Sequence, residues 1–141
     1  MEQGKNISHI KSGWVKKGDK YLFMRSGWEL NYSHYLNEMI KRGRIIDWEY
    51  EVDTFWFDKI KRGTNSYKPD FKVFLPDGTI EYHEIKGYMD SKSKTKLNRM
   101  RIYHPDIKIK LIGVKEYKAI EKFAAVIPNW GRWIRKNPNN K

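Results

Sequence analysis

Residues 67–86 read YKPDFKVFLPDGTIEYHEIK and contain the pattern that decides the fold. Two extended runs, Phe71 to Leu75 and Thr79 to Lys86, lie on either side of Pro76-Asp77-Gly78. Runs of alternating character are typical of half-buried strands, and a short Pro-Asp-Gly turn between two of them predicts a β-hairpin. The stretch therefore places a pair of antiparallel strands near the middle of the chain.

Helical and extended patterns flank this hairpin on both sides. Apolar residues recur at helical spacing after Ser26, which can cap a helix that Gly43 ends. The other expected elements are a strand from Ile45 to Val52, a helix from Ser91 to Tyr103, a half-buried strand over Ile107, Ile109 and Leu111, and a helix from Lys115 to Ala125 with Tyr117, Ile120 and Phe123 facing inward. The sequence thus predicts an α/β fold, a mixed β-sheet flanked by helices in the order α-β-β-β-α-β-α.

The length and charge of the chain describe one folded, basic domain. The 141 residues fit a single domain, with a core over 23–127 and flexible ends at 1–12 and 137–141. Lys and Arg number 29 against 17 Asp and Glu, a formal net charge of +12, and aromatic residues reach 15%, unlike a disordered chain. Such a charge favours a nucleic-acid partner because bound phosphates release counterions, although a surface kept basic for solubility gives the same count.

Several classes of protein are excluded by what the sequence lacks. No apolar run is long enough to span a bilayer, and the first residues do not form a secretory signal, so no membrane partner is expected. The absence of cysteine fits a cytoplasmic protein without disulfides or thiolate metal sites. Since no ligand spacing relates the four histidines, no zinc site is expected from His9, His34, His83 and His104.

The candidate chemistry lies in Asp70, Glu84 and Lys86. Glu84 and Lys86 share one face of their strand because strand side chains alternate, and the hairpin register brings Asp70 beside them. Two carboxylates can hold Mg²⁺, a hard cation that polarises a phosphodiester and activates water, while an ammonium neutralises developing charge. The alternative is a set of solvated ion pairs on an exposed sheet face.

The arrangement of these residues resembles a known nuclease signature. Pro69-Asp70, thirteen intervening residues and then Glu84-Ile85-Lys86 are similar to the PD-(D/E)XK superfamily, which has a restriction-endonuclease-like fold. From Phe23 to Gly113 the chain resembles the phage endonuclease I type of Holliday-junction resolvase. That resemblance rests on Arg25-Ser26-Gly27-Trp28-Glu29, Tyr67-Lys68-Pro69-Asp70-Phe71, Glu84-Ile85-Lys86-Gly87 and His104-Pro105-Asp106-Ile107.

The resemblance implies roles for individual residues. Asp70, Glu84 and the carbonyl of Ile85 are expected to bind Mg²⁺, with Mn²⁺ as a possible substitute, and Lys86 is expected to be the catalytic lysine. Glu29 is the further catalytic acid that the resemblance implies. The spacing from Ser26 to Glu29 also fits a helix capping box, and the resemblance favours catalysis over capping.

Cations near these residues are the expected DNA contacts. They are Arg25, Lys92, Lys94, Lys96 and Arg99, for which a solvated charged face is the alternative. Near the C-terminus, Trp130 is expected in the core, whereas Trp133 fits either the core or a base-stacking role.

The sequence favours one function and leaves two alternatives open. We expect a single nuclease domain that is a Mg²⁺-dependent, structure-selective endodeoxyribonuclease. It would act as a homodimer, intertwined or simple, that resolves four-way DNA junctions by paired nicks, in the host cytoplasm if phage-encoded. The alternatives are a mismatch-directed or nicking endonuclease of the same superfamily, and a non-catalytic protein that binds DNA.

Overall fold

The computed structural model describes residues 11–139, so His9 and the outer parts of the two predicted flexible ends lie outside the described residues. The chain divides into two compact units. The terminal unit comprises Met1–Arg42 and Tyr117–Lys141, and the central unit comprises Gly43–Glu116. A single nuclease domain stays a prediction.

The helices and strands alternate irregularly along the chain. In chain order they are β1 (Gly13–Lys17), β2 (Lys20–Met24), α2 (Gly27–Lys41), β3 (Asp47–Tyr50), β4 (Phe55–Trp56), β5 (Ser66–Tyr67), β6 (Phe71–Phe74), β7 (Ile80–Ile85), α3 (Ser91–Tyr103), β8 (Ile109–Ile112), α4 (Val114–Glu121) and the short 3₁₀ helix η1 (Ala124–Val126). No helix among residues 11–139 is both long and apolar enough to cross a membrane.

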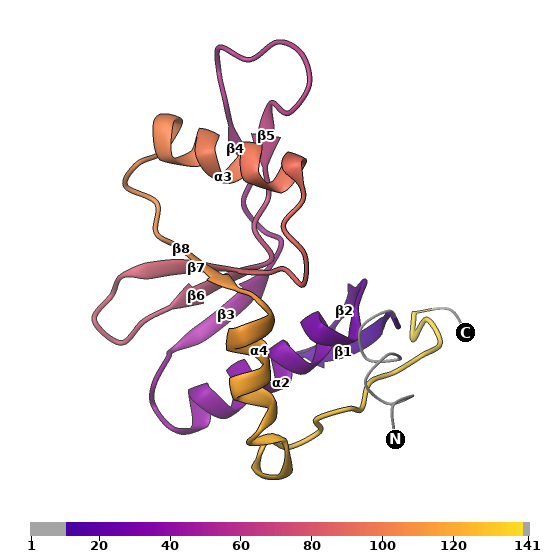
Figure 1. Ribbon diagram of the computed structural model, residues 1–141. Helices are drawn as coiled ribbons and strands as arrows, with labels where there is room; N and C mark the ends of the chain where they lie inside the picture. The colour runs from indigo at the N-terminus through magenta and orange to yellow at the C-terminus, as the bar shows by residue number, and fades with distance from the viewer. Residues whose placement is uncertain (1–10, 140–141) are drawn as a thin grey trace. The chain divides into compact units, whose positions relative to one another are not determined.

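The central unit contains a four-stranded mixed sheet in the order β3-β6-β7-β8 (Figure 1). The predicted hairpin is confirmed, since β6 and β7 pair antiparallel with Phe71 opposite His83. Its turn is held by Asp77, whose carboxylate accepts hydrogen bonds from the backbone N–H and the hydroxyl of Thr79. β8 runs parallel to β7, which makes the sheet mixed as predicted.

Alternate residues of the sheet form its core. Phe71 and Val73 of β6 are fully buried, and the ring of Phe71 packs against Trp48 and Tyr50 of β3 with centroids 5.6 and 5.3 Å away. On β8, however, Leu111 is 39% exposed and Ile112 is buried, so the predicted inward position of Leu111 is wrong. The strand begins at Ile109, later than the apolar alternation suggested.

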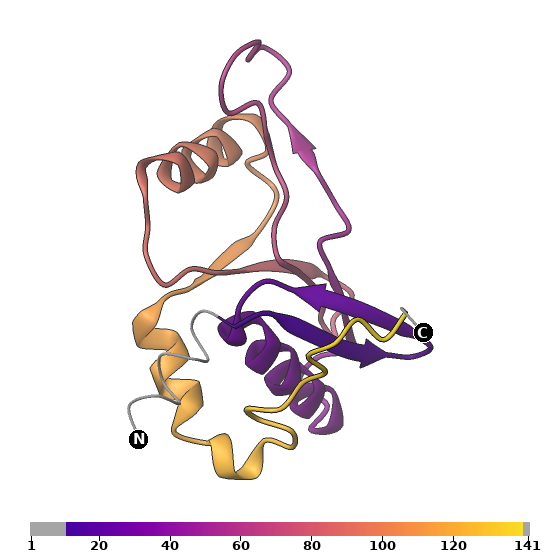
Figure 2. The same cartoon turned by 90° about the vertical axis from the view of Figure 1, so that its right-hand side faces the viewer.

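A second, smaller ribbon packs against α3 within the central unit. β4 and β5 pair antiparallel, with Phe55 opposite Tyr67, and the ribbon and helix can be followed in Figure 2. Phe57 and Tyr67 form a buried cluster with Met100, which belongs to α3. The Arg99 guanidinium donates a hydrogen bond to the Thr64 carbonyl, which ties the loop of the ribbon to α3.

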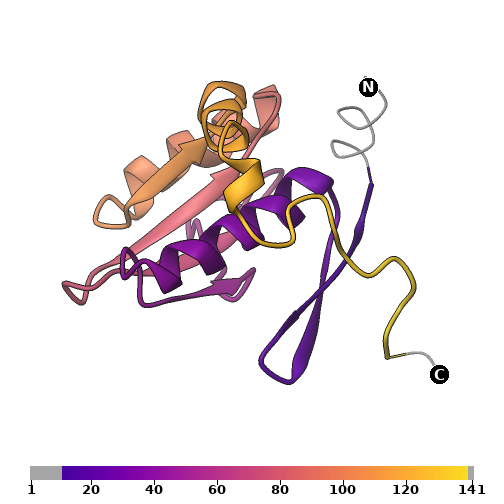
Figure 3. The same cartoon turned by 90° about the horizontal axis from the view of Figure 1, so that it is seen from below.

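The terminal unit combines α2, the β1–β2 hairpin and the C-terminal segment. Ser26 caps α2 as predicted, because its hydroxyl accepts a hydrogen bond from the Glu29 N–H. The Tyr117 ring stacks on Trp28 at 4.1 Å and also packs against Trp130, which is half-buried, so the core position predicted for Trp130 is confirmed only in part. Farther along, Ile134 pairs with Trp14 of β1, and Figure 3 shows this segment passing beside α2 and the hairpin.

The element order departs from the predicted order in four short strands. β1, β2, β4 and β5 do not appear in the sequence-based order α-β-β-β-α-β-α. A strand of two residues, such as β4 or β5, is too short to show an alternating pattern, so periodicity cannot detect it. The last helix is also shorter than predicted: α4 ends at Glu121, and Phe123, expected to face inward, is 63% exposed.

Gly13 supplies a test of the packing in the terminal unit. A Cβ atom at Gly13 would meet the ring of Trp133, with Nε1 only 2.9 Å away. We predict that Gly13→Ala lowers the free energy of unfolding by about 1–3 kcal/mol, the usual cost of overpacking. Urea denaturation followed by circular dichroism measures this loss. The same substitution should cost less in a Trp133→Ala background, and an equal cost in both backgrounds would contradict the contact.

Candidate active site at the end of the central hairpin

Asp70 lies where the ladder between β6 and β7 ends. β6 begins at Phe71, so the backbone N–H of Ile85 on the longer strand β7 extends past it. The Asp70 carboxylate accepts that N–H through Oδ2 at 2.8 Å, and the Asp70 carbonyl accepts the N–H of Glu51 at 2.8 Å. With only 8% of the residue exposed, both the backbone and the side chain of Asp70 are held in place.

Pro69 explains why the ladder stops at this point. Because Phe71 pairs with His83, Pro69 is the residue that would pair with Ile85 if the register continued. A proline has no N–H and cannot donate to the Ile85 carbonyl. The N–H and C=O of one strand residue point to the same side, and the Ile85 N–H points toward Asp70, so the Ile85 carbonyl lies on that side as well.

Glu84 lies on the strand opposite Asp70 and is held by a tyrosine. Continued one residue past its last pair, which is Phe71 with His83, the register puts Asp70 opposite Glu84, and opposite residues of a hairpin share one face of the sheet. The Tyr67 hydroxyl donates a hydrogen bond to Glu84 Oε1 at 2.9 Å. Burial, followed by the charge and hydrogen bond of Glu84 and the charge of Asp70, raises the pKa of Tyr67 far above its ordinary value. The phenol therefore stays a hydrogen-bond donor to this carboxylate.

Lys86 shares a small cavity with Glu84. The cavity has a volume of about 30 Å³ and is lined by Tyr67, Glu84, Lys86, Met89, Ser93, Lys96 and Leu97. Its volume is close to that of one water molecule in the liquid, so it has room for a water or a cation but not for a nucleotide. Lys86 and Lys96 also help to lower the pKa of Asp90, after the larger effect of its hydrogen bonds with Ser93.

The structure separates the four cations that the sequence predicts as DNA contacts on α3. Lys96 lines the cavity that contains Glu84, whereas Lys94 lines a different hollow on the same helix. Lys92 is exposed. Arg99 is bonded to the Thr64 carbonyl, so it has a structural partner in addition to its predicted role. The run of charge is therefore divided among several sides of one helix.

Glu29 and Arg25 belong to the terminal unit, and their predicted parts in this site stay predictions. Glu29 Oε2 accepts a hydrogen bond from the Ser26 hydroxyl at 3.3 Å, so the two side chains at the start of α2 contact each other. Arg25 is exposed immediately before the cap. Ser26 is the N-cap residue of α2, and Glu29 lies in the first turn of that helix.

The donor set fits a hard divalent cation bound in part by water and substrate. Among residues 11–139 no three His, Cys, Asp or Glu side chains gather into a metal-binding group. Mg²⁺ is commonly bound by only one or two carboxylates, and its remaining ligands are waters and phosphate oxygens. Asp70, Glu84 and the Ile85 carbonyl offer oxygen atoms alone, which suits Mg²⁺ or Mn²⁺ and does not suit zinc.

Comparisons of the chain with protein-family profiles, with curated proteins and with solved structures find no match.

Tyr67 is a site residue that the sequence did not predict. It belongs to β5, a strand too short to be predicted, and the sequence assigns it to a motif without a role of its own. One signal was present: Phe55-Trp56-Phe57 and Ser66-Tyr67 flank a polar loop that contains Gly63, which is a hairpin pattern. Pairing these segments would have placed Tyr67 at the end of a strand, three residues before Asp70.

Removing the Tyr67 hydroxyl should change how stability responds to alkaline pH. Because the pKa of Tyr67 is raised in the folded protein, the unfolded chain loses this proton first, and the free energy of unfolding falls as pH rises above about 10. In this range the free energy of unfolding of the wild type should fall by up to about 1.4 kcal/mol per pH unit more than that of Tyr67→Phe. Denaturant titrations at several pH values measure the difference.

The matched control removes a phenol that is open to solvent. Tyr88 is 78% exposed, so Tyr88→Phe should follow the wild-type pH dependence closely. At neutral pH, Tyr67→Phe should cost about 1.5–3 kcal/mol, the range for a hydrogen bond to a charged group. Identical pH profiles for the wild type and Tyr67→Phe would show that the phenol is not buried against Glu84.

Proposed function

We propose that this protein is a divalent-cation-dependent DNA endonuclease that hydrolyses phosphodiester bonds at the Asp70–Glu84–Lys86 site. The observation that supports the proposal is the position of Asp70, whose carboxylate accepts the Ile85 N–H at the end of the β6–β7 hairpin, next to Glu84, which lines one cavity with Lys86. Two acidic side chains opposite each other on a sheet repel, and a cation bound between them offsets that repulsion. The resemblance of this hairpin to the PD-(D/E)XK signature supports the same conclusion.

The roles of the side chains follow from their positions. Asp70 and Glu84 would hold the cation, together with the Ile85 carbonyl. When bound, Mg²⁺ polarises a phosphoryl oxygen and lowers the pKa of water. The Lys86 ammonium, beside Glu84 in the same cavity, neutralises the negative charge that develops on the phosphate in the transition state. Tyr67 keeps Glu84 in position, and Lys96 adds positive charge at the cavity wall.

The substrate is a polymer that binds across the mouth of this cavity. The cavity has room for a water or a cation but not for a nucleotide, so the substrate would stay outside it and present a phosphate oxygen at its mouth. The net charge of +12 favours binding to a nucleic acid, and no motif that reads base edges is evident in the sequence. We therefore propose recognition of DNA shape, with a four-way junction cut by paired nicks in a homodimer as the specific case.

Replacing Asp70 by asparagine should abolish cleavage and leave the fold intact. The side-chain oxygen of the introduced amide can still accept the Ile85 N–H, whereas the charge that holds the cation is lost. Cleavage of a labelled four-way junction in the presence of Mg²⁺ measures the effect. Asp77→Asn, the same change in the exposed hairpin turn, should cleave like the wild type. Equal cleavage by Asp70→Asn and the wild type would overturn the proposed site.

A substitution of Lys86 tests whether its ammonium stabilises transition-state charge, separately from the binding of the cation. Lys86→Gln should lower the turnover by about 10²–10³-fold, the usual effect of removing one group that stabilises transition-state charge. Lys110→Gln removes a lysine from the exposed side of β8 and is the control. A four-way junction, a mismatched duplex and a plain duplex are compared in one assay. Faster cutting of the mismatched duplex would replace the junction-resolving function by a mismatch-directed one, and binding without cleavage would leave only a DNA-binding protein.

A further inference from the structure

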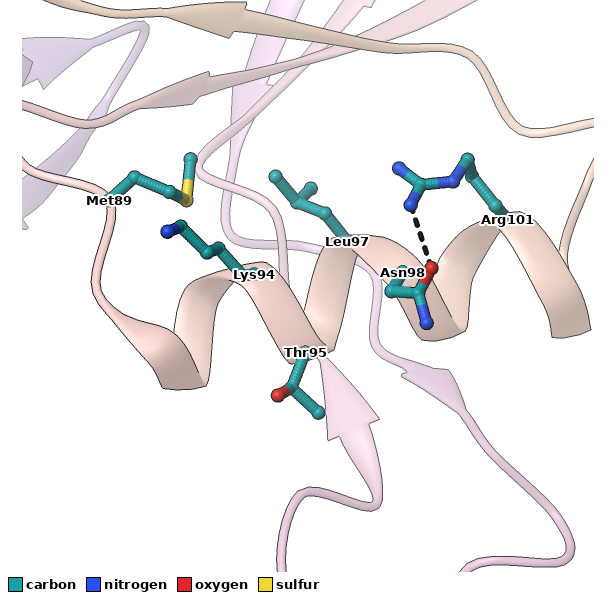
Figure 4. A pocket seen from close by; sticks show the side chains of 6 residues that line it. All are labelled: Met89, Lys94, Thr95, Leu97, Asn98 and Arg101. Carbon is teal, nitrogen blue, oxygen red and sulfur yellow. Dashed lines mark hydrogen bonds between the residues drawn. The ribbon is translucent and has the colours of Figure 1, made fainter.

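A second hollow lies along α3, outside the carboxylate cavity (Figure 4). It has a volume of about 500 Å³ and is lined by Met89, Lys94, Thr95, Leu97, Asn98 and Arg101. In Figure 4 the side chains of Lys94 and Arg101 extend on the same side of the helix, and Leu97 lies between them. The volume is within the range of about 300–1,000 Å³ that small ligands occupy in proteins. The hollow is thus large enough for a nucleotide, unlike the cavity at Glu84.

Two apolar side chains form a common wall between the two spaces. Met89 and Leu97 line the hollow on α3 and also line the small cavity that contains Glu84 and Lys86. The hollow and the cavity therefore adjoin each other at Met89 and Leu97. No other residue lines both spaces among the described part of the chain.

The two cations of the hollow have no acidic partner among the described residues. No ion pair joins Lys94 or Arg101 to an acidic side chain within residues 11–139, and the Arg101 guanidinium donates to the Asn98 side-chain oxygen, at 2.7 Å. The two residues are seven positions apart on α3, which corresponds to about 10 Å along the helix axis. That distance is close to the rise of about three nucleotides in one strand of a duplex.

We infer that the hollow on α3 binds the DNA strand beside the cleaved bond, with phosphates on Lys94 and Arg101 and a nucleoside on Met89 and Leu97. The inference rests on the proposed function, because it places the strand relative to the proposed cleavage site. It also adds Arg101, Met89 and Leu97 to the DNA-contacting surface. The arrangement combines charge for the backbone with apolar surface for a sugar or base, as the two parts of a nucleotide require.

The salt dependence of DNA binding tests the two cations. Affinity for a fluorescein-labelled duplex is measured by anisotropy over a series of salt concentrations, in a buffer without divalent cations, so that nothing is cleaved. Each lost phosphate contact lowers the slope of log K against log[salt] by about one, so Lys94→Gln with Arg101→Gln should lower it by about two. The control, Lys110→Gln with Lys115→Gln, removes the same charge from exposed positions outside the hollow and should leave the slope near that of the wild type.

The apolar wall has its own signature in the same assay. Met89→Ala should weaken binding several-fold at every salt concentration without a change of slope, because an apolar contact releases no counterions. Circular dichroism confirms that each variant is folded. An unchanged slope for the cation pair, or a slope change equal to that of the control pair, overturns the inference, and unchanged affinity for Met89→Ala overturns the nucleoside contact.

The two proposals can fail separately. A slope reduced only in the Lys94 and Arg101 variant, together with junction cleavage that is insensitive to Asp70→Asn, would support the hollow and overturn the cleavage site. Cleavage that depends on Asp70, together with an unchanged slope in the Lys94 and Arg101 variant, would support the cleavage site and overturn the hollow.

Discussion

The hydrogen bond from the Ile85 N–H to the Asp70 carboxylate is the interaction on which the candidate site depends. It replaces the backbone partner that β7 loses where β6 ends, and it fixes a largely buried carboxylate opposite Glu84. Pro69 has no N–H to donate, so the ladder stops at this point and the Ile85 carbonyl receives no bond from it. Burying like charges together costs free energy, which is why such a cluster is more typical of a cation site than of a surface that only needs to be soluble.

The rest of the central unit supports this corner through packing. The cluster of Phe57, Tyr67 and Met100 joins the β4–β5 ribbon to α3, and the Tyr67 hydroxyl extends from that cluster to Glu84. Packing of an apolar ring thereby positions a charged side chain. The same helix presents its cations on other faces, with Lys96 at the carboxylate cavity and Lys94 at the second hollow. One helix can therefore serve both the core and a polyanionic substrate.

The sequence predicts the parts of the fold that have a clear periodicity. The hairpin, the capped helix α2 and the helix from Ser91 to Tyr103 follow from alternation, helical spacing and capping residues. The two-residue strands β4 and β5 have no periodicity to detect, and the hydrogen bond of Tyr67 depends on them. Asp70 and Glu84 could be paired from the register alone, whereas the contacts of Arg99 and Tyr67 join segments that are distant in sequence, so a local pattern could not predict them.

The proposed function requires that Asp70 and Glu84 together bind a divalent cation. Electron paramagnetic resonance of Mn²⁺ titrated into the protein measures this binding directly and requires no DNA. We expect one saturable Mn²⁺ site that is lost in Asp70→Asn and in Glu84→Gln, retained in Asp77→Asn and displaced by Mg²⁺. Absence of saturable binding in the wild type, or equal binding by the wild type and Asp70→Asn, would contradict it.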